Sequence, residues 1–263
     1  MGQILLWTLM LSLTWMVCVW LFSLWAGRVC VIDAFWGPGF GVLATATVLF
    51  RREFDLVWAQ QLLLACVLAW GLRLGIHLGL RIAADPHEDR RYAAMRDKYS
   101  PNFQWKSLGI VFLLQGVILW FVALPVIHGL AATGGMVRSF LLGPGVQFWG
   151  VGEFFEAVGD WQLQRFRRDP ANAGRVLDTG LWAWTRHPNY FGDFCVWWGL
   201  WLVSAACGAP LWTAISPAVM AFFLLRVSGV TLLEKDIGQR RPGYAEYIRR
   251  TSAFFPAPPR RGS

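Results

Sequence analysis

Long apolar runs separated by short polar segments dominate the chain. The first run, residues 4–25, contains no charged residue and has about the 20 residues that a membrane-spanning helix needs. It lacks the basic start and cleavage site of a signal peptide, so we count it as a helix. Six further runs cover residues 31–50, 56–80, 108–130, 140–159, 190–206 and 211–230. The pattern predicts an all-α, polytopic membrane protein with seven transmembrane helices.

Basic residues lie mainly in alternate connections between these runs. The connections 26–30, 81–106, 160–189 and 226–263 hold 20 of the 24 Lys and Arg residues. Because positive charge stays on the cytoplasmic side, we expect an outside N-terminus and a cytoplasmic C-terminus. The net charge of +8 follows from this topology and favours anionic lipid headgroups, so no nucleic-acid partner is expected. We predict one multi-pass domain over residues 1–263, in a bacterial inner membrane or an endoplasmic-reticulum-type membrane.

Metal and disulfide chemistry receive no support from the Cys and His positions. The 5 Cys and 4 His residues are scattered, and the sequence contains neither a C-x-x-C nor an H-x-x-x-H pair. We therefore predict neither a disulfide framework nor a metal site.

Ionisable residues inside the apolar runs are the first candidates for function, because each costs about 2.5–3.5 kcal/mol at a helix centre. Glu153 and Glu156 share one helical face with Asp160, and the predicted third helix carries two of these groups four residues apart. They could pair with one another to hold a helix bundle together, or line a cytoplasmic cavity for a charged ligand. The six residues are Asp33, Arg73, His77, Glu153, Glu156 and Asp193.

Two basic connections indicate the charge of such a ligand. One carries DPHEDRRYAAMRDKY and the other DWQLQRFRRDPANAGRVLDTG. Arg matches phosphate through paired hydrogen bonds, and the interleaved Asn, Asp, Tyr and Trp suit ribose hydroxyls and an adenine ring. The chain has no G-x-G-x-x-G and no Walker sequence. A nucleotide would therefore be held by membrane helices and their connections.

Several motifs resemble the steroid 5-alpha-reductase family, including its bacterial branch of unknown substrate. They are Asp160 with the basic run to Arg167, Arg175, DTGLW, RHPNYFGD and LLEKDIGQRRPGYAEYIRRTSAFFP. The resemblance is strongest over residues 145–256. It implies a seven-helix bundle that binds NADPH from the cytoplasm and takes a hydrophobic enone from the bilayer. The implied reaction saturates a carbon-carbon double bond conjugated to a ketone in a steroid-like or other hydrophobic lipid.

The same resemblance implies roles for individual residues. The family's second helix carries a Glu whose nearest counterpart is Asp33, which we expect to be protonated and to donate to the substrate carbonyl. The family's third-helix Tyr is missing, and Trp70, Arg73 or His77 could replace it. The implied cofactor-binding residues are Arg90, Arg91, Asp160, Arg167, Arg175, Arg186, His187, Asn189, Tyr190, Asp193, Glu234, Tyr247 and Arg249.

Other interpretations of these residues stay open. Asp33 could cap the second helix, and Asn189 after Pro188 could simply begin a helix. The motif RHPNY also occurs in isoprenylcysteine carboxyl methyltransferases, so an S-adenosylmethionine-dependent methyltransferase is the alternative enzyme. A non-catalytic lipid-binding or transport protein is the third possibility. The Arg clusters favour a ligand rich in phosphate, which NADPH is and S-adenosylmethionine is not.

Overall fold

The computed structural model describes residues 1–51, 55–133, 137–227 and 243–260. Within these ranges the chain is helical and contains no β-strand, which confirms the predicted all-α class. The chain divides into two compact units. The first comprises residues 1–139 and 203–213, and the second comprises residues 140–202 and 214–263. The predicted single domain over residues 1–263 stays a prediction.

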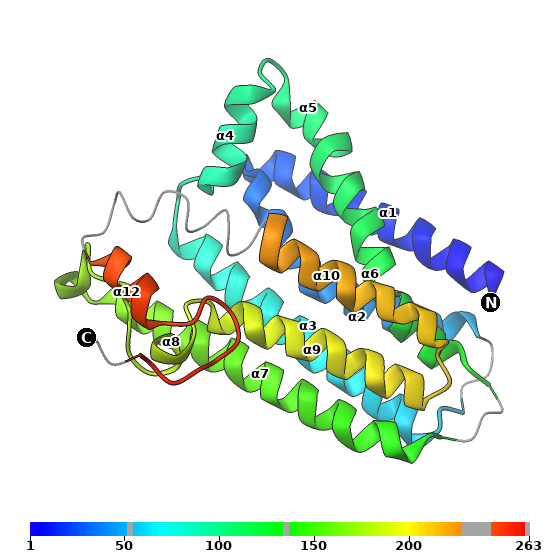
Figure 1. Cartoon of the computed structure of the whole chain (residues 1–263). Helices are drawn as coiled ribbons and strands as arrows, with labels where there is room; N and C mark the ends of the chain where they lie inside the picture. The colour runs from blue at the N-terminus through cyan, green and yellow to red at the C-terminus, as the bar shows by residue number, and fades with distance from the viewer. Residues whose placement is uncertain (52–54, 134–136, 228–242, 261–263) are drawn as a thin grey trace. The chain divides into compact units, whose positions relative to one another are not determined.

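The first unit contains four stretches that are long and apolar enough to cross a membrane. They are Gly2–Ala26, Val29–Phe50, Trp58–Ala84 and Phe103–Ala131, and they coincide with the first four predicted spans. In element terms they are α1 (Gly2–Ala26), η1 and α2 (Val29–Val31, Ile32–Phe50), α3 (Trp58–Ala84), and α5, η2 and α6 (Phe103–Ser107, Leu108–Leu113, Leu114–Ala131). Figure 1 shows α4 (Arg90–Lys98) and α5 as a hairpin at one end of this unit. The predicted 81–106 connection therefore contains two short helices.

Glycines allow α2 and α3 to pack backbone against backbone. A Cβ atom added at Gly71 would lie 2.6 Å from the carbonyl oxygen of Gly37, and one at Gly75 would lie 2.5 Å from the ring of Pro38. Small residues at such contacts are typical of membrane helices, where close approach replaces the hydrophobic driving force. The contact continues to Ala34, whose carbonyl oxygen would lie 2.9 Å from that Cβ at Gly75. It therefore holds the first turns of α2 against the second half of α3.

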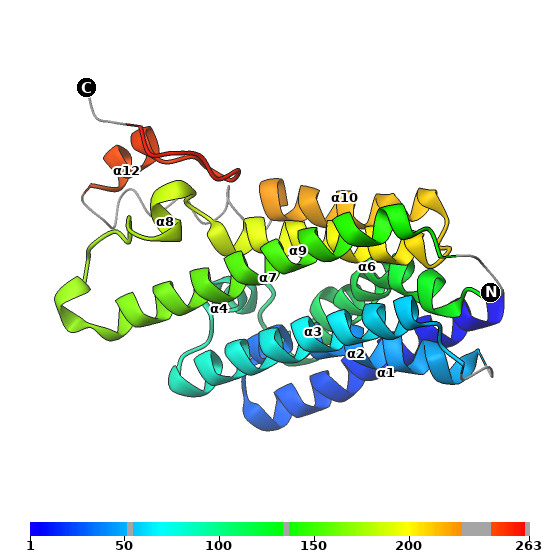
Figure 2. The ribbon, with the colours of Figure 1, turned by 90° about the horizontal axis from the view of Figure 1, so that it is seen from below.

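The second unit is built around the long helices α7 (Ser139–Arg168) and α9 (Pro188–Ala206), seen together in Figure 2. Its other elements are η3 (Pro170–Asn172), α8 (Leu181–Trp184), α10 (Ile215–Phe222), η5 (Phe223–Val227) and α12 (Tyr244–Arg250). The fifth and sixth predicted spans coincide with α7 and α9. The apolar segment Leu211–Arg226 matches the described part of the seventh but is shorter than a spanning helix. The count of seven spans thus stays a prediction.

A row of close contacts joins α7 to α9. A Cβ at Gly152 would lie 2.5 Å from the amide nitrogen of Val196, and one at Gly192 would lie 2.5 Å from the amide nitrogen of Glu156. One turn further, a Cβ at Gly199 would meet the amide nitrogen of Trp149 at 2.5 Å. The two helices are therefore in backbone contact over several turns, which leaves no room for a side chain at these glycines.

This contact predicts a position-specific effect of alanine on stability. Gly152→Ala should lower the free energy of unfolding by about 1–3 kcal/mol, because the helices must move apart to admit the methyl group. Gly150, on the same helix, is exposed, with no heavy atom within 4 Å of an added Cβ. Gly150→Ala should leave stability unchanged or raise it slightly, since Ala favours helix. Thermal unfolding in detergent measures both, and equal midpoints would contradict the contact.

Candidate functional site

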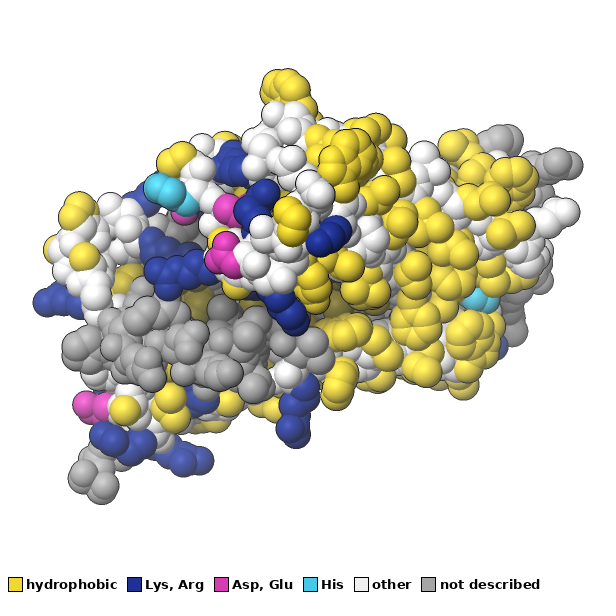
Figure 3. All heavy atoms as spheres, turned by 90° about the horizontal axis from the view of Figure 1, so that it is seen from above, with side chains coloured by type: hydrophobic (Ala, Val, Ile, Leu, Met, Phe, Trp, Pro, Cys, Tyr) yellow, Lys and Arg dark blue, Asp and Glu magenta, His cyan; other side chains and the backbone are white. Residues whose placement is uncertain are grey.

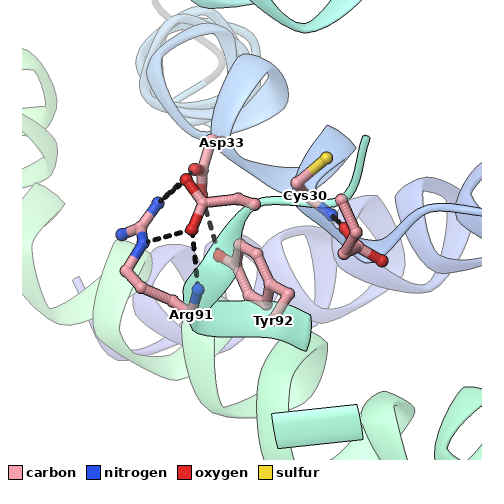
Figure 4. Close-up of polar contacts among 6 residues, drawn as sticks. Cys30, Asp33, Arg91 and Tyr92 are labelled. Atoms are coloured by element: carbon pink, nitrogen blue, oxygen red, sulfur yellow. Dashed lines mark hydrogen bonds and ion pairs between the residues drawn. The ribbon is translucent and has the colours of Figure 1, made fainter. Parts of the chain in front are cut away.

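Asp33 lies in the first turn of α2 and is bonded by two side chains of α4. Arg91 Nη2 lies 2.7 Å from Asp33 Oδ2, and the Tyr92 hydroxyl donates to Asp33 Oδ1 at 2.8 Å (Figure 4). The Asp33 side chain is 19% exposed, and Tyr92 is buried. A guanidinium and a phenol from one short helix thus converge on a single carboxylate.

Asp89 fixes the start of α4 and the direction of Arg91. Its Oδ1 atom accepts hydrogen bonds from the Arg91 amide at 2.9 Å and from Arg91 Nε at 3.0 Å. Burial lowers the pKa of Arg91, but the Asp33 and Asp89 carboxylates more than offset this and hold the pKa above its ordinary value. Burial and the Asp33 carboxylate also hold the pKa of Tyr92 well above its ordinary value. Arg91 is therefore charged and Tyr92 is neutral at physiological pH.

Glu88 bonds the segment that precedes α2. Its carboxylate accepts hydrogen bonds from the Val29 amide at 3.0 Å, the Cys30 amide at 2.8 Å and Arg96 Nη2 at 3.0 Å. Burial raises the pKa of Glu88, but the two amides and Arg96 more than offset this and leave it below the ordinary value. Glu88 is therefore a charged carboxylate that joins the segment before α2 to Arg96 of α4.

The structure changes the predicted role of Asp33. Both of its carboxyl oxygens accept hydrogen bonds, one of them from a charged guanidinium, so the prediction of a protonated donor is wrong for this arrangement. Its interpretation as a helix cap is also wrong, because the N-cap position belongs to Val31. Asp33 is instead an ion-paired acceptor that holds Tyr92.

The third-helix candidates lie at different depths in the first unit. Trp70 is fully buried, and its ring packs 5.6 Å from that of Phe40. Phe40 is seven residues along α2 from Asp33, which corresponds to about 10 Å along the helix axis. The aromatic donor beside Asp33 is thus Tyr92 and not Trp70. Arg73 lies one turn along α3 from Trp70.

Charged side chains of the first unit gather around this cluster. Figure 3 shows Lys, Arg, Asp and Glu over α4 and the connection before it, while hydrophobic side chains cover the surface of α1 and α6. Arg90 begins α4 and is exposed, as a nucleotide ligand could require. Arg91 differs, because its guanidinium is bonded to the Asp33 and Asp89 carboxylates. Its predicted role in cofactor binding stays a prediction, and in this structure its guanidinium pairs with Asp33.

In the second unit, RHPNYFGD begins α9 and meets α7. The helix starts at Pro188, as the helix-start interpretation predicted. Asn189 also reaches α7, where its Nδ2 atom donates to Asp160 Oδ1 at 3.2 Å. The rings of His187 and Tyr190 stack at 5.5 Å and 9°. The structure therefore brings four predicted cofactor residues together, and the predicted residue Asp193 is buried one turn further along α9.

Arg186 differs from its neighbours in this motif. Its Nη1 atom donates to the carbonyl oxygens of Thr251 at 2.6 Å and Ile248 at 3.3 Å, and its amide donates to the Ser252 carbonyl at 2.9 Å. It is buried, and it satisfies carbonyl groups at the end of α12. Arg186 therefore anchors the C-terminal segment, which replaces its predicted role as a cofactor ligand.

A pocket of about 550 Å³ opens beside α12. Arg175 and Arg250 line it together with two acidic residues, Asp178 and Glu246, and the ring of Tyr247. Arg250 is ion-paired with Asp178. The Tyr247 hydroxyl donates to the Trp182 carbonyl at 2.6 Å, which fixes the ring in place.

The pocket brings together some of the predicted cofactor residues and not others. Arg175 and Tyr247 line the same cavity, but Arg250 occupies the position expected of Arg249. Arg167 is exposed at the end of α7 and does not line the pocket. Glu234 lies outside the residues that the structure describes.

Sequence reasoning missed Tyr92, Glu88 and Arg250 as site residues. Tyr92 stands in the quoted connection, directly after two arginines, but its partner Asp33 is 59 residues away. Glu88 has the same difficulty, since its amide partners are 58 and 59 residues away. No local signal distinguishes Arg249 from Arg250, because only the direction of α12 decides which one enters the pocket.

Comparison with known proteins gives one partial relative and one family. The relative is an uncharacterized protein of Schizosaccharomyces pombe, 28% identical over 112 residues. The match covers 40% of this chain and 32% of the relative, so it spans about a third of the length of that protein. No solved structure matches the chain.

The family match is much longer. The model described as "Protein of unknown function (DUF1295)" matches residues 19–251. This family is associated with steroid 5-alpha-reductase-like proteins. The match includes both the Asp33 cluster and the whole pocket beside α12. Because it covers well over half of the sequence, the chain belongs to the DUF1295 family.

Proposed function

We propose that the protein is a membrane reductase that uses NADPH to saturate a carbon-carbon double bond conjugated to a ketone in a steroid-like or other hydrophobic lipid. The observation that carries this proposal is the neutral, buried phenol of Tyr92 held against the ion-paired carboxylate of Asp33. The motifs shared with the steroid 5-alpha-reductase family and the association of DUF1295 with that group support the same reaction.

The reaction needs a hydrogen-bond donor at the ketone oxygen. NADPH, when bound, supplies the hydride that adds to the β carbon of the enone. The electron pair of the double bond then moves toward the ketone, whose oxygen becomes negatively charged until the α carbon takes a proton. The Tyr92 hydroxyl has one proton, which its raised pKa keeps in place at neutral pH and which it donates here to Asp33 Oδ1. It would donate to the ketone oxygen by turning from that carboxylate when the substrate binds. A donor positioned in advance stabilises the developing charge.

Arg91 compensates the negative charge of the Asp33 carboxylate beside Tyr92. A carboxylate next to Tyr92 would repel a developing oxyanion, which is why a protonated Asp33 was expected. The guanidinium at 2.7 Å from Asp33 Oδ2 compensates that charge without protonation. Asp33 can therefore hold the Tyr92 hydroxyl while Arg91 offsets part of the negative charge of the Asp33 and Asp89 carboxylates.

The pocket beside α12 has the chemistry to hold the phosphate-bearing end of NADPH. The guanidinium group of Arg175 matches phosphate, and Glu246 can accept hydrogen bonds from ribose hydroxyls, while Arg250 and Asp178 are ion-paired with each other in the pocket wall. Tyr247 is buried beneath these residues, and its hydroxyl bond to the Trp182 carbonyl holds α12 in place beside the pocket. These residues fit a nucleotide that carries several phosphates.

The cluster at the start of α9 would bind the nicotinamide end of NADPH, which is the part that transfers the hydride. Asn189 carries an amide that could pair with the nicotinamide carboxamide, and Asp160 fixes its orientation through the 3.2 Å hydrogen bond. His187 and Tyr190 present stacked rings of limited polarity beside it. We assign cofactor binding to these residues of the second unit.

Membrane embedding supports a hydrophobic substrate. Four helices of the first unit are long and apolar enough to span a bilayer, and exposed Leu, Ile, Phe and Trp side chains cover them. We propose that the seven helical ranges all cross the membrane, with the N-terminus outside and both site clusters facing the cytoplasm. A lipid-like enone would then enter from the bilayer, and NADPH would enter from the cytoplasm.

Removal of the Tyr92 hydroxyl should impair chemistry and spare cofactor binding. Tyr92→Phe should reduce single-turnover NADPH oxidation with a saturating enone by about 100- to 1,000-fold, the usual loss for one donor at an oxyanion. NADPH affinity should stay within twofold. Tyr99→Phe is the matched control, because Tyr99 ends the same helix and has no contact with Asp33 among the described bonds. An unchanged rate for Tyr92→Phe in folded protein would overturn this role.

Arg175 should contribute to the choice of NADPH over NADH. The 2'-phosphate distinguishes the two cofactors, and one charge-assisted hydrogen bond is worth about 1.5–3 kcal/mol. Arg175→Ala should therefore weaken NADPH by about tenfold or more and NADH much less. Arg249→Ala, outside the pocket, should change neither by more than twofold. Calorimetric titration measures these affinities; equal affinity for both cofactors, or preferential binding of S-adenosylmethionine, would contradict the proposal.

A further inference from the structure

The segment that leads into α2 has backbone donors that its own helix cannot satisfy. The first N–H groups of any helix lack an intrahelical acceptor. Here the helical stretch begins with η1 at Val29, and the residue before it, Arg28, is extended. The Val29 and Cys30 amides donate to Glu88, whose two carboxyl oxygens each accept one of them. Figure 4 shows the bond from the Cys30 amide. Glu88 therefore caps this helix from a distant part of the chain.

Glu88 stands close in sequence to the other half of the carbonyl site. The next residue, Asp89, is the N-cap of α4 and accepts from the Arg91 amide at 2.9 Å. Arg91 and Tyr92 follow within four residues of Glu88, and Asp33 follows Cys30 by three residues. A short path thus runs from Tyr92 along the backbone to Glu88, through its hydrogen bond to the Cys30 amide, and along the backbone to Asp33.

We propose that Glu88 is a positioning residue, which sets the register between α2 and α4 and thereby holds the Tyr92 hydroxyl against Asp33. It makes no contact with Tyr92 or Asp33 among the described hydrogen bonds, so it acts through the two helix starts. This inference rests on the proposed function, in which the Tyr92 hydroxyl is the donor to the substrate carbonyl.

The chemistry of the three bonds requires a carboxylate at this position. Two amide donors and the Arg96 guanidinium converge on the two Glu88 oxygens. Only a side chain with two acceptor oxygens can satisfy all three donors. The lowered pKa of Glu88 agrees with a charged group. A glutamine would keep one oxygen but present an NH₂ group to the remaining donors. Glu88→Gln is therefore nearly equal in size but unable to make the same set of bonds.

The experiment follows the environment of Tyr92 directly. Full-length protein is labelled with 3-fluorotyrosine in detergent micelles, and its ¹⁹F spectrum is recorded at neutral pH. The chain has 5 Tyr residues, and the Tyr92 line is assigned by its loss in Tyr92→Phe. Asp33→Asn gives the line position of a phenol that has lost its carboxylate partner. We expect Glu88→Gln to move the Tyr92 line more than halfway to that position and to leave the other four lines in place.

Asp85→Asn is the matched control. Asp85 lies in the same connection, and its side chain is 66% exposed and bonded to His87. This variant removes a nearby negative charge without touching the start of α2, so the Tyr92 line should not move. Should Glu88→Gln fail to fold, Glu88→Asp decides the matter. It keeps the charge, but it is one methylene too short to reach both amides, and we expect a smaller shift in the same direction.

An unmoved Tyr92 line in folded Glu88→Gln or, where that variant does not fold, in Glu88→Asp would overturn the positioning role. So would an equal shift in Asp85→Asn, because the effect would then be one of charge alone. Turnover is compared in a double-mutant cycle of Glu88→Gln and Tyr92→Phe. If Glu88 acts through Tyr92, Glu88→Gln should slow enone reduction at least tenfold in the unmodified protein and less than twofold in the Tyr92→Phe background.

The two arms separate this inference from the function on which it rests. Failure of the unmodified protein to oxidise NADPH with any enone would overturn the proposed reduction. A shifted Tyr92 line in the same preparation would still support the role of Glu88 in holding the Tyr92–Asp33 pair. Conversely, normal turnover with an unmoved line in Glu88→Gln would overturn the positioning role and leave the reductase proposal standing.

Discussion

The carboxylate of Asp33 at the start of the apolar helix α2 must be paired, and the surrounding structure follows from that requirement. An unpaired charge in such a place costs several kcal/mol, whereas a nearby guanidinium and a phenol donor offset the cost. Arg91 and Tyr92 supply both groups. They can do so only because α4 begins close to α2, where Glu88 and Asp89 bond the two helix starts. One ion pair thus links the fold of a connection to the candidate chemistry.

Close helix packing places the polar residues of each unit in a comparable way. Gly37, Gly71 and Gly75 let α2 and α3 touch along their backbones, which holds the turn that carries Asp33. Gly152 and Gly192 do the same for α7 and α9, and a further Cβ at Gly159 would meet Pro188 at 3.2 Å. The contact between Asn189 and Asp160 lies at the end of this row. In both units, glycines without room for a side chain bring polar residues within hydrogen-bond reach.

Hydrophobic periodicity predicted the helical ranges well because spanning length and apolar character are local properties. The first four ranges meet both criteria, while α7 carries Glu153, Glu156 and Asp160 and falls short on hydropathy. Local spacing also placed Asn189 near a helix start. Local spacing cannot predict contacts between distant segments. The contacts of Tyr92 with Asp33 and of Glu88 with Cys30 depend on how the helices pack. The orientation of α12 likewise decides that Arg250 lines the pocket and Arg249 does not. The protonated Asp33 was wrong for the same reason, since its ionic partner is distant in sequence.

We propose that hydride passes from NADPH to the β carbon of an enone. The most direct measurement supplies purified protein in detergent with NADPH deuterated at the transferring position of the nicotinamide, together with a panel of flat hydrophobic enones. Mass spectrometry of the products then locates the label. The account predicts a saturated ketone with one deuterium at the β carbon and an equal amount of oxidised cofactor. Binding of NADPH without any labelled product across the panel, or saturated product without deuterium, would contradict it.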